Sequence, residues 1–188
     1  MVSRTALSID SLENYPTEEG VSLIRKAYEG GVNFYQISDN NKHLKELLGY
    51  SFYGMRKEIF IAVASCALDT ISLQQEIIST LDTLNSTYID IFSLHNDNFV
   101  PKKDTKDGLY LSLLSAKADE NIKSIGFSTS KLELAKEALE SKLYDVIFFD
   151  FSLENSKIQE INNFFEECKK QEIGLIIKYK KPISEEVN

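Results

Sequence analysis

The stretch NIKSIGFSTSKLELAKEAL, residues 121–139, joins two hydrophobic patterns of different period. Its first part, Ile122 to Ser128, is a short apolar run of the kind that forms a buried strand. From Ser130 onward the apolar residues recur three or four positions apart, which indicates an amphipathic helix. Ser130 and Glu133 also have the spacing of a capping box at a helix start. The stretch therefore predicts a strand that leads directly into a helix.

The same pattern recurs along the chain at intervals of roughly 30 residues. Segments of helical period separate the predicted strands, and one of them begins with the capping-box pair Ser72 and Gln75. Repeated strand–helix units call for parallel strands with right-handed crossovers. The predicted strands are Thr5 to Ile9, Val32 to Ile37, Ile59 to Ala64, Ile89 to Leu94, Ile122 to Ser128, Val146 to Phe151 and Gly174 to Lys178.

Two architectures fit parallel strands that are buried on both faces, an open doubly wound sheet and a (β/α) barrel. Neither GxGxxG nor GxxxxGK[ST] follows any predicted strand, so the usual nucleotide-binding motifs of open sheets are missing. Polar residues instead follow several strands, where barrels place their sites. We therefore expect one α/β domain over residues 1–188, a TIM-type (β/α) barrel. The polar residues are Ser38, Asp39, Asn41, Ser65, His95, Asn96, Asp97, Ser128, Thr129 and Ser130.

The composition excludes several classes of partner and site. Of the 188 residues, 43% are hydrophobic and 27% charged, which suits a soluble globular protein with one buried core. The formal net charge of −8 disfavours nucleic acid and anionic membranes as partners. No apolar run has signal-peptide or membrane-spanning length, so we expect a cytoplasmic protein. Cys66 and Cys168 lack metal-site spacing, which predicts two reduced, partly buried thiols and no metal.

Four stretches of the chain resemble motifs of the aldo/keto reductases, which are NADPH-dependent enzymes built on a (β/α)8 barrel. The motifs keep their order and spacing, and the resemblance extends from about Thr17 to Pro182. It implies the barrel of that family, limited to about seven strands because the chain ends shortly after Pro182. The stretches are AYEGGVNFYQISDNN (27–41), KELLGYSFYGMRKEIFIAVA (45–64), TLDTLNSTYIDIFSLHN (80–96) and NIKSIGFSTSKLELAKEAL (121–139).

The resemblance also points to lost catalytic groups. In the family a Tyr protonates the carbonyl oxygen as hydride arrives, a Lys paired with an Asp lowers the pKa of that Tyr, and a His orients the substrate. The Asp position falls on Gln36, the Tyr position on Asn41 and the Lys position on Ala64. An amide N–H is far too weak an acid to deliver the proton, and only the His survives, as His95.

The cofactor positions implied by the resemblance are depleted as well. In the family a Ser-Asn pair after the fifth strand and a Gln on the sixth hold the nicotinamide amide. Here Ser128 and Thr129 stand at the pair, and either Phe148 or Phe149 stands at the Gln. Tyr179, in the stretch GLIIKYKKPI, has a counterpart on the seventh strand. Because the loops that grip the cofactor phosphates are missing, we expect no cofactor, with NADP(H) as the one candidate.

The first hypothesis is a pseudoenzyme, an aldo/keto reductase-like protein without reductase activity that acts as a partner or regulatory binding subunit. The last strand of a seven-stranded sheet would expose unpaired backbone groups, and such edges pair with other chains or are covered. We expect the open barrel edge to be covered by a second copy in a homo-oligomer, by a partner protein, or by the N-terminal segment.

Two alternative hypotheses assign a catalytic function to the chain. In one, the barrel mouth acts on an unidentified small molecule, with His95 and either Asp39 or Asp97 as acid and base. In the other, the chain is a shortened oxidoreductase that binds NADP(H) in an unusual way or is completed by another chain. The structural interpretation of His95 is a hydrogen-bonded remnant, and that of Asp39 is a helix cap. The expected pocket residues are Gln36, Asp39, Asn41 and Asn96.

Overall fold

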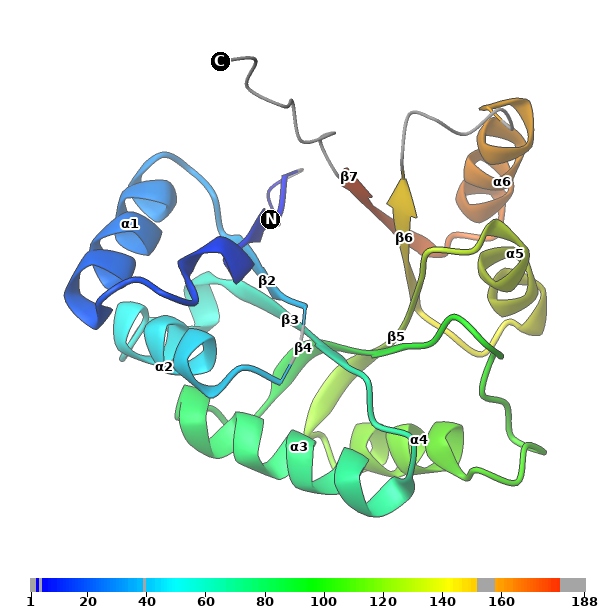
Figure 1. Ribbon diagram of the computed structural model, residues 1–188, viewed down its shortest axis with the longest axis horizontal. Coiled ribbons are helices and arrows are strands. Elements are labelled where there is room, and N and C mark those ends of the chain that lie inside the picture. Colours follow the sequence, from blue (N-terminus) through cyan, green and yellow to red (C-terminus); the bar gives the residue numbers. More distant parts are fainter. Residues whose placement is uncertain (1–2, 4, 39, 152–157, 180–188) are drawn as a thin grey trace, which may run out of the picture. The chain divides into compact units, whose positions relative to one another are not determined.

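The computed structural model describes residues 3, 5–38, 40–151 and 158–179, and Figure 1 shows its elements. Within them, strands alternate with helices, and the seven strands are neighbours in sequence order, from β1 to β7. The strand pairs of known register are parallel. A parallel sheet in sequence order results when a crossover after each strand returns the chain to the same end of the sheet. The predicted strand–helix repeat is therefore confirmed.

Every predicted strand is present, with bounds that lie within two residues of those expected. The strands are β1 (Leu7–Ser8), β2 (Phe34–Ile37), β3 (Phe60–Ser65), β4 (Ile89–His95), β5 (Ile122–Thr129), β6 (Val146–Phe151) and β7 (Gly174–Tyr179). The helices are α1 (Thr17–Glu29), α2 (Lys42–Ser51), α3 (Thr70–Leu84), α4 (Leu109–Ala118), α5 (Leu132–Ser141) and α6 (Ile158–Lys170). Two 3-10 helices, η1 (Asp10–Leu12) and η2 (Arg56–Glu58), precede α1 and β3.

The chain divides into two compact units. Unit 1 comprises residues 1–94 and 101–125, and unit 2 comprises residues 95–100 and 126–188. Helices α1 to α4 belong to unit 1, and helices α5 and α6 belong to unit 2. The expectation of a single domain over residues 1–188 stays a prediction.

In unit 1, almost all residues of the strands β2 and β3 are buried. Tyr35 pairs in register with Ile61, and Ile37 pairs with Val63. Strands that are apolar on both faces are typical of parallel sheets covered by helices. In Figure 1, α1 lies beside α2, and α3 lies beside α4. The helices therefore pack against one another as well as covering the strands.

Two glycines allow the helices of unit 1 to approach closely. A Cβ on Gly20 in α1 would lie 2.8 Å from a methyl carbon of Leu47 in α2. A Cβ on Gly49 in α2 would lie 2.8 Å from the carbonyl oxygen of Thr83 in α3. The Leu47 side chain could move aside, but the Thr83 carbonyl is part of the helix backbone. A larger residue at position 49 would therefore push α2 away from α3.

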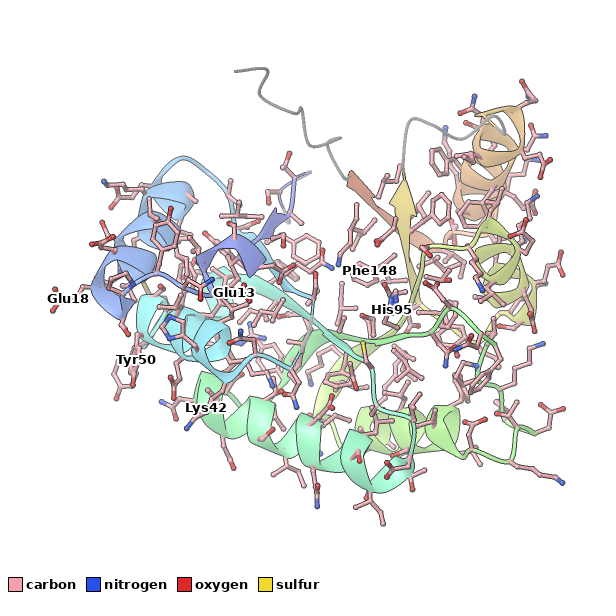
Figure 2. The ribbon with its side chains drawn as sticks, viewed as in Figure 1. Glu13, Glu18, Lys42, Tyr50, His95 and Phe148 are labelled. Atoms are coloured by element: carbon pink, nitrogen blue, oxygen red, sulfur yellow. The ribbon has the colours of Figure 1, made fainter. Side chains whose placement is uncertain are left out.

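Unit 2 has an aromatic core on β6, which pairs with β5 on one side and β7 on the other. Phe149 packs against Phe164 of α6 with 6.0 Å between ring centroids, and both rings are buried. Phe148 is also buried, and Figure 2 labels its side chain. Because successive strand residues point to opposite faces, Phe148 lies on the face of β6 opposite to Phe149.

Two helix starts differ from the predicted capping boxes. Asp69 caps α3, because its Oδ1 accepts the N–H groups of Ile71 and Ser72 at 3.0 and 2.9 Å. The Ser72 hydroxyl donates to Asp69 at 2.7 Å. Before α5, the Ser130 hydroxyl donates to Asp97, and no side chain caps the helix. Both capping-box predictions are wrong, because a carboxylate within reach is the stronger acceptor and engages each serine as a donor.

The two cysteines have different environments. Cys168 in α6 is buried, and burial raises the pKa of its thiol to about 11. A thiol with a raised pKa stays protonated and unreactive near neutral pH. Cys66 is exposed. The expected partial burial is therefore confirmed for Cys168 and wrong for Cys66.

Arg56 connects η2 to β3 and β4 in unit 1. Its guanidinium donates to Asp90 Oδ2 at 2.6 Å and to the carbonyls of Ile59 and Tyr88, each at 3.1 Å. Asp90 also accepts the Ile61 N–H at 2.8 Å. The side chains of Arg56 and Asp90 are only 15% and 12% exposed. Loss of either partner would therefore leave a largely buried charge without compensation.

We expect Arg56→Ala to lower the free energy of unfolding by about 3 kcal/mol, because Asp90 would remain charged without its partner. Urea denaturation followed by circular dichroism measures this change. Lys57→Ala is the matched control, since Lys57 is exposed in the same 3-10 helix and should change stability by less than about 0.5 kcal/mol. Equal effects of the two substitutions would contradict the role assigned to Arg56.

Candidate functional site

His95 ends β4, and Figure 2 labels its side chain. Its Nδ1 lies 3.1 Å from Ser128 Oγ, which is a hydrogen-bond distance. Its Nε2 lies 3.7 Å from Asp97 Oδ2, which is too long for a hydrogen bond but allows attraction when the ring is protonated. The Asn96 N–H donates to the Ser128 carbonyl at 3.0 Å. The predicted residues His95, Asn96 and Ser128 are therefore neighbours in unit 2.

Asp97 has three hydrogen-bond donors around its carboxyl group. The Thr129 hydroxyl donates at 2.5 Å, and the N–H and hydroxyl of Ser130 donate at 2.8 and 2.7 Å. Burial raises the pKa of Asp97, but these hydrogen bonds and the nearby His95 outweigh burial and hold the pKa below its ordinary value. Asp97 is thus a carboxylate at neutral pH, and it has no proton to donate.

Asn96 shapes the turn that follows β4. Its residue is 4% exposed, and its Oδ1 accepts the N–H groups of Asn98 and Phe99 at 2.8 and 3.1 Å. An Asn side chain that accepts from the backbone two and three residues ahead stabilises a turn. Asn96, the residue expected to line a pocket, therefore has a structural role through its side-chain carbonyl oxygen.

The predicted cofactor residues Ser128 and Thr129 are 2% and 0% exposed. Both hydroxyls are engaged in the hydrogen bonds described above. Phe148 pairs in register with Ser128, so the two side chains lie on the same face of the sheet. Of the two phenylalanines at the expected Gln position, Phe148 is the neighbour of Ser128. Tyr179 ends β7, and the expectation for its side chain stays a prediction.

In unit 1, Gln36 and Ala64 occupy the expected Asp and Lys positions. Gln36 on β2 is 4% exposed, and its Nε2 has no hydrogen-bond partner among the described residues. Ala64 on β3 is 3% exposed and pairs in register with Ser93. A buried amide and a methyl group carry no charge. Neither can therefore lower the pKa of a proton donor by electrostatic attraction.

Asn41, at the expected Tyr position, caps α2. Its Oδ1 accepts the Leu44 N–H at 3.2 Å, and its backbone carbonyl accepts the Lys45 N–H at 3.3 Å. An N-cap Asn satisfies an N–H group that the first turn of a helix leaves unpaired. The expected cap, Asp39, lies outside the described residues. The structure assigns the capping role to Asn41 instead.

Three tyrosines near β2 do not have the environment of a catalytic acid. The Tyr35 hydroxyl donates to the Val32 carbonyl at 2.8 Å, and burial, reinforced by Tyr28, raises its pKa to about 12. Tyr50 and Tyr53 are 58% and 77% exposed. A general acid for a neutral-pH reaction needs a lowered pKa and an enclosed substrate. These tyrosines therefore have packing and surface roles.

Lys45 is a buried cation that the sequence reasoning missed. It lies on α2, is 2% exposed, and its Nζ donates to Asn40 Oδ1. Lysine is almost never this buried without a polar partner. The helical period was the available signal, because Lys45 adjoins the buried positions of Leu44 and Leu48 on the helix surface. Lys45, Asn40 and Asn41 form a polar cluster at the start of α2.

Residues 3, 5–38, 40–151 and 158–179 offer neither a metal-binding cluster nor a membrane-spanning helix. No group of three or more His, Cys, Asp or Glu side chains in these ranges could hold a metal ion. A protein metal site needs at least about three ligands, and His95 with Asp97 supplies two. No helix in the same ranges is long and apolar enough to cross a membrane.

Several solved structures are similar to this chain in fold. The holo form of an aldo-keto reductase from Bacillus halodurans matches with a TM-score of 0.76 and 17% identity, over 94% of this chain and 61% of that one. A structure from Pseudomonas aeruginosa assigned to the aldo-keto reductases matches with a TM-score of 0.77 and 18% identity, over 94% of this chain and 73% of that one. An aldo/keto reductase from Klebsiella pneumoniae, in complex with NADP and acetate, matches with a TM-score of 0.76 and 14% identity, over 93% of this chain and 62% of that one. The chain thus spans less than two thirds of the Bacillus and Klebsiella structures.

The sequence model of the aldo/keto reductase family matches residues 5–180. Because this match covers most of its length, the chain belongs to the aldo/keto reductase family. The predicted fold class is confirmed as the TIM-type (β/α) barrel fold of this family, represented here by seven parallel strands. A search of curated proteins finds no match. Activity must therefore be argued from the residues of the site.

The residues around His95 also have the composition of an acyl-transfer triad, with a Ser, a His and an Asp. Ser128 is 2% exposed, so its hydroxyl is not presented to a substrate. The 3.7 Å between His95 and Asp97 exceeds the hydrogen bond that orients the base in a triad. The arrangement can bind and orient a polar group, but it lacks an exposed nucleophile.

Asp97→Asn tests the electrostatics of this cluster. Because the folded-state pKa is lowered, Asp97 contributes stability that is present above its unfolded pKa of about 3.8 and is lost as the pH falls through the folded pKa. We expect the substitution to reduce stability at neutral pH by about 1 kcal/mol and to weaken the loss of stability in acid. Urea midpoints at neutral pH and below pH 3.8 measure both effects. Asp82→Asn, at an exposed carboxylate on α3, is the control, and an unchanged pH dependence of Asp97→Asn would contradict the assignment.

Asn41→Ala tests whether Asn41 caps α2. We expect the free energy of unfolding to fall by about 1 kcal/mol, because the Leu44 N–H loses its acceptor. Asn41→Asp should keep the stability, since a carboxylate also accepts at a helix N-terminus. Thermal or urea unfolding of the three proteins gives the comparison. Equal stability of Asn41→Ala and the parent would show that the cap is not used.

Proposed function

We propose that the protein acts by binding a partner, as a pseudoenzyme of the aldo/keto reductase family, and does not reduce carbonyl compounds. The observation that carries the proposal is the chemistry at three positions, Gln36, Asn41 and Ala64. These positions hold a buried amide, an amide that caps a helix, and a methyl group. They supply neither a proton donor nor the charges that would activate one.

The reaction that these positions would have to support needs a proton. Hydride transfer to a carbonyl carbon leaves negative charge on the oxygen, and a positioned acid must neutralise that charge. A side-chain amide does not release its N–H proton near neutral pH. Loss of a general acid slows a reaction by roughly 10²-fold to 10⁴-fold. A scaffold with no acid at this position therefore supports binding better than reduction.

His95 is the residue on which any remaining catalysis would depend. Its side chain is 32% exposed, so a ligand could reach it. Its Nδ1 is engaged with Ser128 Oγ, and Asp97 Oδ2 lies 3.7 Å from Nε2. We propose that His95 orients a bound polar group and does not replace the missing acid.

NADP(H) binding is the second part of the proposal. The Klebsiella structure contains NADP, and that relative shares the fold at 14% identity. In this chain the hydroxyls of Ser128 and Thr129 are buried and engaged, and Phe148 stands in register beside Ser128. A phenyl ring has no donor or acceptor for a carboxamide. We therefore propose that the chain has no functional NADP(H) site.

The partner surface that we propose is the edge of the sheet at β7. β7 stands at one end of the strand order and pairs with β6. Ile177 on β7 is 43% exposed. Edge strands offer unpaired backbone groups, and those with apolar side chains are commonly covered by another chain. We propose that a partner protein or another copy of the chain covers this edge.

Titration of the purified protein with NADPH, followed by nucleotide fluorescence, tests the proposal, and the mass in solution is measured on the same sample. We expect no saturable fluorescence change and a defined mass. With simple aldehydes added, NADPH oxidation should not exceed the rate without protein, because no residue protonates the developing alkoxide. His95→Ala is the matched control and should give the same absence of turnover as the parent.

Aldehyde turnover by the parent that disappears in His95→Ala would overturn the proposal and favour catalysis through His95. Saturable NADPH binding without turnover would remove the cofactor part of the proposal and leave the loss of reductase activity intact.

A further inference from the structure

Exposed aliphatic side chains gather on one face of unit 1. Of the seven exposed leucines and isoleucines in the described part of the chain, five lie on or just before α3 and α4. Single exposed apolar residues are normal, but a cluster marks a surface that contacts something. The five are Leu68 (74% exposed), Ile71 (67%), Ile78 (57%), Leu111 (48%) and Leu114 (39%), and together they define the α3–α4 face.

The five side chains form one surface because the two helices begin next to each other (Figure 1). A Cβ on Gly108, just before α4, would lie 3.2 Å from Cγ2 of Thr70, the first residue of α3. Ile71 and Ile78 are two helical turns apart and project from the same side of α3. The leucine pair of α4 is about one turn apart. The α3–α4 face is therefore two adjacent rows of aliphatic side chains.

Two exposed carboxylates stand beside these rows, Asp69 between Leu68 and Ile71, and Asp82 one turn after Ile78. The other exposed residues beside them are Gln74, Gln75 and Ser79 of α3 and Ser115 and Ala118 of α4. This is unlike the chain as a whole, in which 27% of residues are charged and the net charge is −8. Two copies with that net charge repel each other unless the surfaces that meet lack like charges. In the α3–α4 face the exposed carboxylates stand near the two ends of α3, and the exposed residues between them are uncharged.

The charges at the margin of the face are complementary to each other. α3 contains Glu76 and Asp82 and no basic residue, whereas α4 contains Lys117 and no acidic residue. A two-fold axis parallel to the helices would place α3 of one copy over α4 of the other. Unlike charges would then face each other on both sides of the apolar rows. The complementarity lies within one chain, which is the arrangement that an isologous dimer needs.

We propose that the α3–α4 face binds a second copy of this chain in a symmetric dimer. The five aliphatic side chains leave roughly 500 Å² of apolar surface exposed. With their uncharged neighbours, the face approaches the roughly 800 Å² per partner of a standard protein interface. The dimer uses neither the β7 edge nor the residues around His95, so it stands or falls independently of the function proposed above.

Sedimentation equilibrium of the full chain tests the dimer. We expect the parent to have twice the 21.4 kDa mass of one chain, and Ile78→Glu to have the mass of one chain. The substitution enters a symmetric interface twice and buries two like charges, so the dissociation constant should rise by at least about 100-fold. Leu111→Glu, on the other helix, should have the same effect. Both positions are exposed, so the circular dichroism spectrum of each variant should match that of the parent, which shows that the fold is kept.

Two control variants separate the face from other surfaces. Leu23→Glu changes an exposed leucine on α1, and Ile177→Lys changes the exposed edge strand β7, and both should remain dimers. A parent that is monomeric at all concentrations would overturn the proposal. A dimer that survives Ile78→Glu and Leu111→Glu would also overturn it, and its loss in Ile177→Lys would assign the contact to the β7 edge. Dissociation by Leu23→Glu as well would show that any added surface charge separates the chains, which contradicts a specific face.

Discussion

The Asn96 N–H donates to the Ser128 carbonyl at 3.0 Å, just beyond the end of β4. This backbone bond joins the segment after β4 to the end of β5, next to His95. Beside this bond the His95 ring lies within hydrogen-bond distance of the Ser128 hydroxyl, and Asp97 accepts from the hydroxyls of Thr129 and Ser130. In parallel strands that follow one another in sequence, all the carboxyl ends lie at one edge of the sheet. Residues about thirty positions apart are therefore joined by hydrogen bonds there.

That edge has a second requirement, which explains why its polar residues need not be catalytic. Each strand is followed by a helix, and the first turn of a helix leaves N–H groups that need acceptors. Asn41 caps α2 and Asp69 caps α3, while Asp97 accepts the Ser130 N–H just before α5. The same residue types serve caps and active sites, because both use side-chain oxygens near backbone N–H groups. Polar residues after the strands therefore indicate the edge of the sheet without indicating chemistry.

The surface and the interior of the chain support the same interpretation. Inside, an amide at Gln36 and a methyl group at Ala64 provide no charge for catalysis, and the largely buried ion pair of Arg56 with Asp90 links structural elements. Outside, the exposed residues of α3 between Asp69 and Asp82 are uncharged in a chain of net charge −8. Catalytic groups and interaction surfaces are under different physical demands, because the first need perturbed pKa values and the second need complementary shape and charge. Gln36, Asn41 and Ala64 do not meet the first demand, and the α3–α4 face is a candidate for the second.

The sequence by itself determined the order of strands and helices, the class of fold, and the absence of an acid and a base at Gln36, Asn41 and Ala64. The order of elements follows from hydrophobic period, which is a local property. The class of fold and the three positions follow from the resemblance to the aldo/keto reductases together with residue chemistry. Only the tertiary structure decided that Lys45 is buried and that Ser72 and Ser130 donate to carboxylates instead of capping helices. It also decided that Phe148, and not Phe149, is the neighbour of Ser128. Each of these depends on which groups the packed chain brings within hydrogen-bond or contact distance, and no local pattern specifies that distance.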